Sequence, residues 1–124
     1  MTNQIQGETL FKGWAGAGTD DWVYTPWLTV RGDVATFAIE VTAVSGVTVT
    51  WNVETRTRES TTVENVFNSN QTISATGIDP ATNDGASDVP AKELVRYKYA
   101  TGSGASTTDF VTLRALQPAW QADR

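Results

Sequence analysis

Apolar and polar residues alternate along much of this chain with a period of two, which is typical of strands with one buried face. The clearest stretch covers residues 36–54, where the odd-numbered positions carry most of the apolar side chains. Ser45 and Gly46 interrupt this stretch, so the pattern predicts two strands joined by a turn. No long stretch shows the 3.6-residue apolar repeat of a helix.

The register of this predicted hairpin follows from the alternation. Because both strands bury odd-numbered residues, a three-residue turn over residues 44–46 keeps buried positions opposite one another, whereas a two-residue turn would not. Gly46 then takes the position that needs a positive φ, as in a hairpin with a G1 bulge. The predicted buried pairs are Ala43–Val47, Val41–Val49, Ile39–Trp51 and Phe37–Val53.

A second hairpin is predicted near the end of the chain. Its strands cover residues 95–99 and 111–115, and the Gly- and Ser-rich residues 101–107 form its tip. Shorter strands are predicted at residues 9–14, 22–24, 62–67 and 71–76. The Asp-, Ala-, Gly- and Pro-rich residues 77–92 predict a long loop.

About eight short strands at this spacing predict an all-β protein, an antiparallel β-sandwich of jelly-roll type. The length of 124 residues fits a single domain covering residues 1–124. We expect flexible arms at residues 1–7 and 117–124.

The composition narrows the chemistry, because histidine and cysteine are both absent. This excludes Ser-His-Asp and Cys-His nucleophiles, Cys/His zinc sites, iron–sulfur clusters and disulfides. We therefore expect a protein that is not an enzyme and that needs no cofactor and no metal. Charged residues make up only 19% of the chain, whereas twenty threonines suit exposed strand faces.

The net charge of -5 repels phosphate backbones, so nucleic acid is not an expected partner. No apolar segment is long enough for a membrane helix, so a membrane is not an expected partner either. The first residues lack the basic and apolar regions of a signal peptide, which predicts synthesis without secretion.

Carboxylates are the main acid–base groups that remain. Glu40 and Glu54 are predicted on one polar face, but about 13 Å apart along the strand, which is too far for a paired glycosidase mechanism. The loop residues Asp79, Asn83, Asp84 and Asp88 offer oxygen ligands for calcium, but their spacing does not fit an EF-hand and turn chemistry explains them. Arg31-Gly32-Asp33 matches the integrin-binding tripeptide, but a turn is needed there in any case.

Two surface groups are candidates for binding. Trp14, Trp22, Tyr24 and Trp27 lie close together in the sequence, and such rings form interface anchors or sugar platforms, although they also cap cores. Arg96, Lys98 and Arg114 are predicted on the polar face of the second hairpin as a basic stripe. The stripe could face Glu40 and Glu54 of a neighbouring copy, or be an ordinary solvated face.

The chain resembles the small structural proteins of tailed bacteriophages. The similarity lies in residues 93–99, the Gly-rich tip, residues 110–120 and residues 54–59. It implies a virion protein, made in the host cytoplasm, that decorates and stabilises the capsid as a homo-oligomer. The implied partners are the major capsid protein or other virion proteins.

Two alternatives belong to other classes. A carbohydrate-binding β-sandwich would bind a glycan through Trp14, Trp22, Tyr24 and Trp27. An enzyme that uses carboxylates alone would depend on residues such as Glu40 and Glu54.

Overall fold

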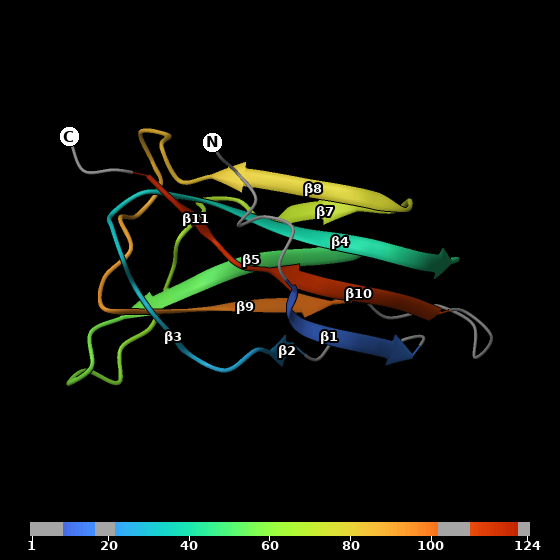
Figure 1. Cartoon of the computed structure of the whole chain (residues 1–124), viewed down its shortest axis with the longest axis horizontal. Coiled ribbons are helices and arrows are strands. Elements are labelled where there is room, and N and C mark those ends of the chain that lie inside the picture. The colour runs from blue at the N-terminus through green and yellow to red at the C-terminus, as the bar shows by residue number, and fades with distance from the viewer. Residues whose placement is uncertain (1–8, 17–21, 102–109, 122–124) are drawn as a thin grey trace.

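A computed structural model describes residues 9–16, 22–101 and 110–121, with side chains described from Trp22 onward. This part of the chain contains eleven strands and forms two antiparallel sheets that pack face to face (Figure 1). The predicted all-β sandwich is therefore confirmed. No helix in the described ranges is long and apolar enough to cross a membrane.

The first sheet, called sheet A, is built around its longest strand, β4 (Ala35–Ser45). On one side β4 pairs with β10 and, at its start, with β11. On the other side it pairs with β8, while β1 pairs with the far side of β10. The bounds of these partners are β1 (Thr9–Gly16), β8 (Gly77–Thr82), β10 (Phe110–Leu116) and β11 (Ala119–Trp120).

The second sheet, sheet B, has two long strands at its centre, β5 (Val49–Arg56) and β9 (Leu94–Ala100). Short strands flank this pair: two of them pair with β9 and two with β5. The strands on the β9 side are β2 (Val23–Tyr24) and β3 (Leu28–Thr29), and those on the β5 side are β6 (Glu64–Asn65) and β7 (Gln71–Ile73).

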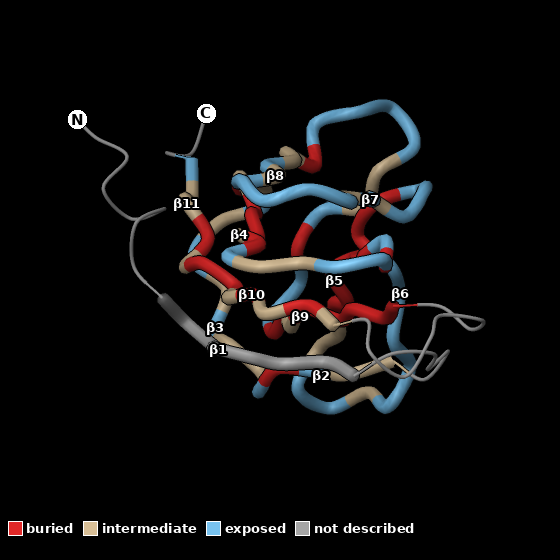
Figure 2. The backbone as a smooth tube through the Cα atoms, turned by 90° about the vertical axis from the view of Figure 1, so that its right-hand side faces the viewer, coloured by how far each residue is buried: buried red, intermediate tan, exposed pale blue. Residues whose placement is uncertain are grey.

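The core lies between the two sheets and includes most odd-numbered residues of β4 and β5. Figure 2 colours the buried segments red. Trp51 is fully buried there, as predicted. Its ring and that of Phe37 both contact the ring of Tyr97, with centroids 5.9 and 6.0 Å apart respectively. The Phe37–Tyr97 contact is edge-to-face and the Trp51–Tyr97 contact is tilted, and aromatic pairs of this kind stabilise a core beyond the area that they bury.

The first predicted hairpin is wrong, because β4 and β5 belong to different sheets. Gly46 has the predicted positive φ, 74°, but the chain uses it to cross from sheet A to sheet B. Alternation fixes which residues are buried. It does not distinguish a neighbour beside a strand from one across the core, so Ile39 and Trp51 share the core without pairing.

The second predicted hairpin is wrong for the same reason, since β9 lies in sheet B and β10 in sheet A. Most of its predicted tip lies outside the described residues. Each strand finds its partners far away in sequence: β9 pairs with β5, and β10 pairs with β1 and β4.

Two segments predicted as irregular contain strands. Residues 77–82 of the predicted long loop form β8, an edge strand in which Asp79 and Pro80 are tolerated. Residues 119–120 of the predicted C-terminal arm form β11, and Trp120 packs against the ring of Phe37 at 5.9 Å. The predicted arm at residues 1–7 lies outside the described residues.

Candidate functional site

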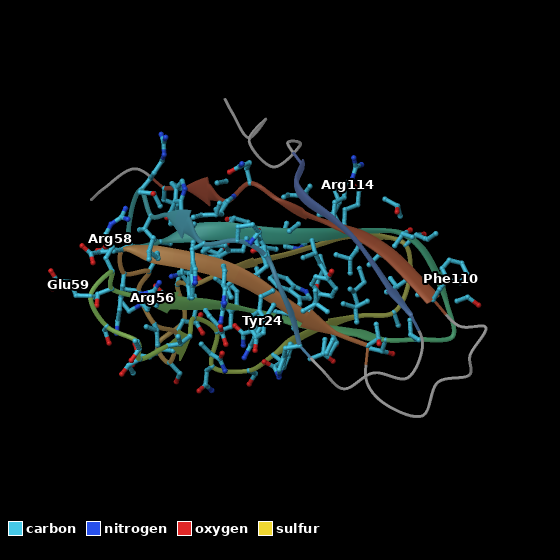
Figure 3. The ribbon with its side chains drawn as sticks, turned by 90° about the horizontal axis from the view of Figure 1, so that it is seen from below. Tyr24, Arg56, Arg58, Glu59, Phe110 and Arg114 are labelled. Atoms are coloured by element: carbon cyan, nitrogen blue, oxygen red, sulfur yellow. The ribbon has the colours of Figure 1, made fainter. Side chains whose placement is uncertain are left out.

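Aromatic rings lie over basic side chains on the outer face of sheet B. The Arg96 guanidinium carbon is 4.0 Å from the centroid of the Tyr24 ring and 4.3 Å from that of Trp27. Lys98 Nζ lies 4.4 Å from the Trp22 ring centroid. The Arg56 guanidinium carbon is 4.8 Å from the Trp27 ring centroid. With Glu54, these residues form what we call the aromatic–cation cluster. Figure 3 labels Arg56 and Tyr24 of this group.

Strand alternation and a short edge segment place these side chains. Even-numbered residues of β9 point outward, so Arg96 and Lys98 share the outer face of sheet B. The segment that carries the rings is held along β9, because Tyr24 is the register partner of Lys98. Thr25 continues the attachment, since its N–H donates to the Tyr97 carbonyl at 3.0 Å and its hydroxyl accepts from the Tyr97 N–H at 3.0 Å.

Glu54 neutralises the centre of the cluster. Its Oε1 accepts from Arg96 Nε at 3.0 Å and from Arg96 Nη2 at 2.9 Å, and its Oε2 lies 3.2 Å from Lys98 Nζ. The side chains of Glu54 and Lys98 are only 10% and 9% exposed, so rings and strands shield these charges from water. Shielding strengthens both the ion pairs and the cation–π contacts. The cluster therefore fastens residues 22–27 across sheet B.

Two groups that were predicted separately thus meet in one place, since Trp22, Tyr24 and Trp27 lie over Arg96 and Lys98. Trp14, the fourth candidate ring, is in β1 of sheet A, and its side chain is outside the described set.

The predicted basic stripe is wrong for Arg114, which does not share a face with Arg96 and Lys98. Arg114 (labelled in Figure 3) lies on the outer face of sheet A. It is away from Arg96 and Lys98, because β10 and β9 are in different sheets. There its Nε donates to Glu40 Oε1 at 2.7 Å. The acidic partners suggested in a neighbouring copy are therefore found within the same chain, Glu40 for Arg114 and Glu54 for Arg96.

Glu40 and Glu54 do not share a face as predicted. Glu40 belongs to β4 of sheet A and Glu54 to β5 of sheet B, and each points outward. The whole sandwich separates the two carboxylates, so they do not form the paired acid and base of a glycosidase.

Three of the four candidate calcium ligands, Asp79, Asn83 and Asp88, are engaged by the protein itself, whereas Asp84 is exposed. Asp79 Oδ2 accepts from Trp51 Nε1 at 2.8 Å, and Asp88 Oδ2 accepts from the Gly85 N–H at 3.1 Å. Asn83 is buried; it accepts from the Ala35 N–H at 2.9 Å and donates to two backbone carbonyls. Among the residues that the structure describes, no three carboxylates gather as a metal site.

The Arg31-Gly32-Asp33 tripeptide forms a bend between β3 and β4. Its backbone is tied down, because the Asp33 carbonyl accepts from the Ala91 N–H at 2.9 Å and from Asn83 Nδ2 at 3.0 Å. The side chains of Arg31 and Asp33 are exposed. The local structure is thus fully explained by the turn that the sequence needs there.

Sequence reasoning missed two parts of this arrangement. Arg56 follows Glu54 in the series of even-numbered, outward-facing residues of β5, so extending the alternation from residue 54 to residue 56 would have placed Arg56 on the same face. Glu54 was assigned to a solvated face, whereas the residue is only 8% exposed. Its burial follows from the rings packed over β9, which the sequence pattern does not show.

A buried tyrosine joins the two sheets beneath the cluster. Tyr97 donates its hydroxyl to the Leu116 carbonyl at 2.8 Å and accepts from the Ala38 N–H at 3.0 Å. Burial raises the pKa of Tyr97 well above its usual range, although the bond from Ala38 partly opposes this. Burial also raises the pKa of Tyr99. Both hydroxyls therefore stay protonated in the folded protein at neutral pH.

Comparisons with known proteins add no relative. No family model matches the chain, and neither a curated protein nor a solved structure matches it. The function is therefore argued from the strand arrangement and from the surfaces described above.

Proposed function

We propose that this chain is a non-enzymatic structural protein of a bacteriophage particle, a capsid decoration protein that binds the head lattice as a homo-oligomer. The observation that carries the proposal is the order of strands in the two sheets. This order supports a sandwich of jelly-roll type, an architecture used by viral capsid domains.

The jelly-roll assignment depends on treating interrupted strands as units. We count β2 with β3, β6 with β7, and β10 with β11, which reduces the eleven strands to eight units. Sheet A then has the order first, eighth, third, sixth, and sheet B has the order second, seventh, fourth, fifth. In this order, strand units from the two ends of the chain pair with each other in both sheets, which is the arrangement that two Greek keys produce in a jelly roll.

Decoration of a lattice suits a domain of this kind. Each copy needs only weak contacts, because the symmetry of the capsid multiplies them. The outer faces of the two sheets differ in chemistry. Sheet B carries the aromatic–cation cluster, whereas sheet A carries the Arg114–Glu40 pair beside hydrogen-bonded threonines. In the proposed assembly, one of these two faces contacts the lattice and the other faces solvent.

Purified phage particles test the proposal directly. We expect a 13.4 kDa band in particles banded on a density gradient, identified by peptides of this chain in mass spectrometry. Its band should keep a constant ratio to the major capsid protein through a second gradient, whereas a soluble host protein should not. Absence of these peptides from washed particles would contradict the proposal.

The carbohydrate-binding alternative is supported by one observation, the 42% exposure of Tyr24. Against it, Arg96 and Lys98 occupy one face of the rings that a sugar would stack on. Titration with an oligosaccharide panel while tryptophan fluorescence is followed distinguishes the two functions. A saturable change that is lost in Tyr24→Ala would favour the carbohydrate-binding function.

A further inference from the structure

The edge of sheet A at β8 is a place where a second copy of this chain could add a strand. In the described ranges β8 pairs with β4 only, so no described strand pairs with the backbone groups on its other side. Free edges of this kind are templates for association between chains. The question is which backbone groups of β8 point outward.

Hydrogen bonds around β4 fix the direction of its backbone groups. Ile39 and Val41 each pair with both β10 and β8, so these two strands lie on opposite sides of β4. The Asn83 N–H, directly beyond β8, donates to the Ala35 carbonyl at 3.4 Å, so the groups of Ala35 face β8. The Ala38 N–H points the opposite way, to the Tyr97 hydroxyl that also bonds the end of β10. In this part of β4, odd-numbered residues therefore face β8 and even-numbered residues face away from it.

The register transfers this direction to β8. Ala38 is opposite Pro80, and because the groups of Ala38 face away from β8, this is a pair without mutual hydrogen bonds. The nitrogen of Pro80 therefore faces the free edge, as do the backbone groups of Ile78 and Thr82. Pro80 has no N–H, so the middle donor of the outward row is missing.

We propose that Pro80 blocks strand addition at the β8 edge and so prevents a second copy of this chain from extending sheet A there. The edge needs such a block. It is six residues long, and Ile78 beside Pro80 is 54% exposed. The edge strands of sheet B need less protection, because β2, β3, β6 and β7 have only two or three residues each.

Amide hydrogen exchange tests the geometry. The N–H groups of Asp79 and Ala81 point toward β4 and should exchange slowly, whereas those of Ile78 and Thr82 should exchange at least about tenfold faster. Slow exchange at Ile78 and Thr82 in the wild-type protein would contradict an open, outward-facing edge.

Substitution tests the block itself. Pro80→Thr restores the missing donor, so we expect the weight-average mass to rise about twofold with concentration, as for a two-fold symmetric pair. Pro90→Thr, which removes an exposed proline outside any strand, is the matched control and should leave the mass unchanged.

A rescue variant separates edge pairing from loss of stability. Ile78→Pro in the Pro80→Thr background places a proline at another outward-facing nitrogen, and it should restore the wild-type mass. Mass by light scattering and the melting temperature are measured for each variant. The proposal fails if Pro80→Thr keeps the wild-type mass, or if the mass rises equally with and without Ile78→Pro.

Discussion

The hydroxyl of Tyr97 fills a gap in the hydrogen-bond ladder of β4. The pairing of β10 with β4 reaches Ile39, and the pairing of β11 starts at Thr36, so the Ala38 N–H between them has no strand partner on that side. Pro118, which lies between β10 and β11, has no N–H to offer. Tyr97 extends from the opposite sheet and bonds both Ala38 and Leu116.

Removing this hydroxyl should therefore be costly. Tyr97→Phe keeps the ring but leaves a buried N–H and a buried carbonyl without partners, so we expect a loss of about 2–4 kcal/mol in the free energy of unfolding. Urea denaturation followed by tryptophan fluorescence measures it. Tyr24→Phe, which removes a hydroxyl from an exposed ring, should change the free energy by less than about 0.5 kcal/mol. Equal effects in the two variants would contradict the bridging role.

Stability should also fall at high pH. Burial raises the pKa values of Tyr97 and Tyr99, so above pH of about 10 the unfolded chain releases these protons while the folded chain keeps them. The unfolded state then binds fewer protons, and the free energy of unfolding decreases as the pH rises. Urea denaturation at several pH values between about 9 and 11 should show this decline. The decline should be shallower in Tyr97→Phe, and an unchanged slope would contradict the assignment.

At the scale of elements, the aromatic–cation cluster attaches a weakly paired segment to a sheet. β2 and β3 have two residues each and are separated by Pro26, so backbone pairing alone holds them poorly. Stacking of Trp22, Tyr24 and Trp27 on cations of β5 and β9 adds side-chain contacts along the same segment. Glu54 stabilises this arrangement, because its carboxylate neutralises the charges of Arg96 and Lys98.

Glu54→Gln should loosen this attachment. It leaves Arg96 and Lys98 shielded from water but without their carboxylate, so we expect a loss of about 2 kcal/mol or more in the free energy of unfolding. Glu40→Gln is the matched control on sheet A, where the more exposed pair with Arg114 should contribute less than about 1 kcal/mol. Urea denaturation gives both values. A larger effect for Glu40→Gln would contradict the proposed role of the cluster.

At the scale of the whole molecule, most strand pairs join segments that are distant in sequence. β1 pairs with β10, β4 with β10, and β5 with β9, while the consecutive long strands β4 and β5 do not pair. Closing such long loops costs entropy before any contact compensates for it. The topology therefore delays the gain in stability until both sheets assemble.

We expect slow folding as a consequence. All-β domains dominated by non-local pairing fold in about milliseconds to seconds, and this chain should fall in that range. Stopped-flow dilution from urea, followed by the fluorescence of buried Trp51, measures the rate. Folding complete within tens of microseconds would contradict this expectation.

Much of the candidate site was open to prediction from the sequence, but its assembly was not. Alternation correctly gave the outward direction of Arg96 and Lys98, and composition gave the rings of Trp22 and Tyr24 as surface candidates. The rings lie on those cations because β2 pairs with β9, and these two strands are more than seventy residues apart in sequence. Local patterns carry no information about that pairing.

The sequence by itself determined the strand class, the buried faces of β4, β5, β9 and β10, and the positive φ of Gly46, because each depends on period-two alternation or on local backbone sterics. Only the tertiary structure decided that β4 and β5 face each other across the core, and that Arg114 lies apart from Arg96. The apolar face of a strand is buried equally well whether the next strand pairs with it in the same sheet or faces it across the core. The choice between these arrangements therefore depends on how the whole chain satisfies its backbone groups.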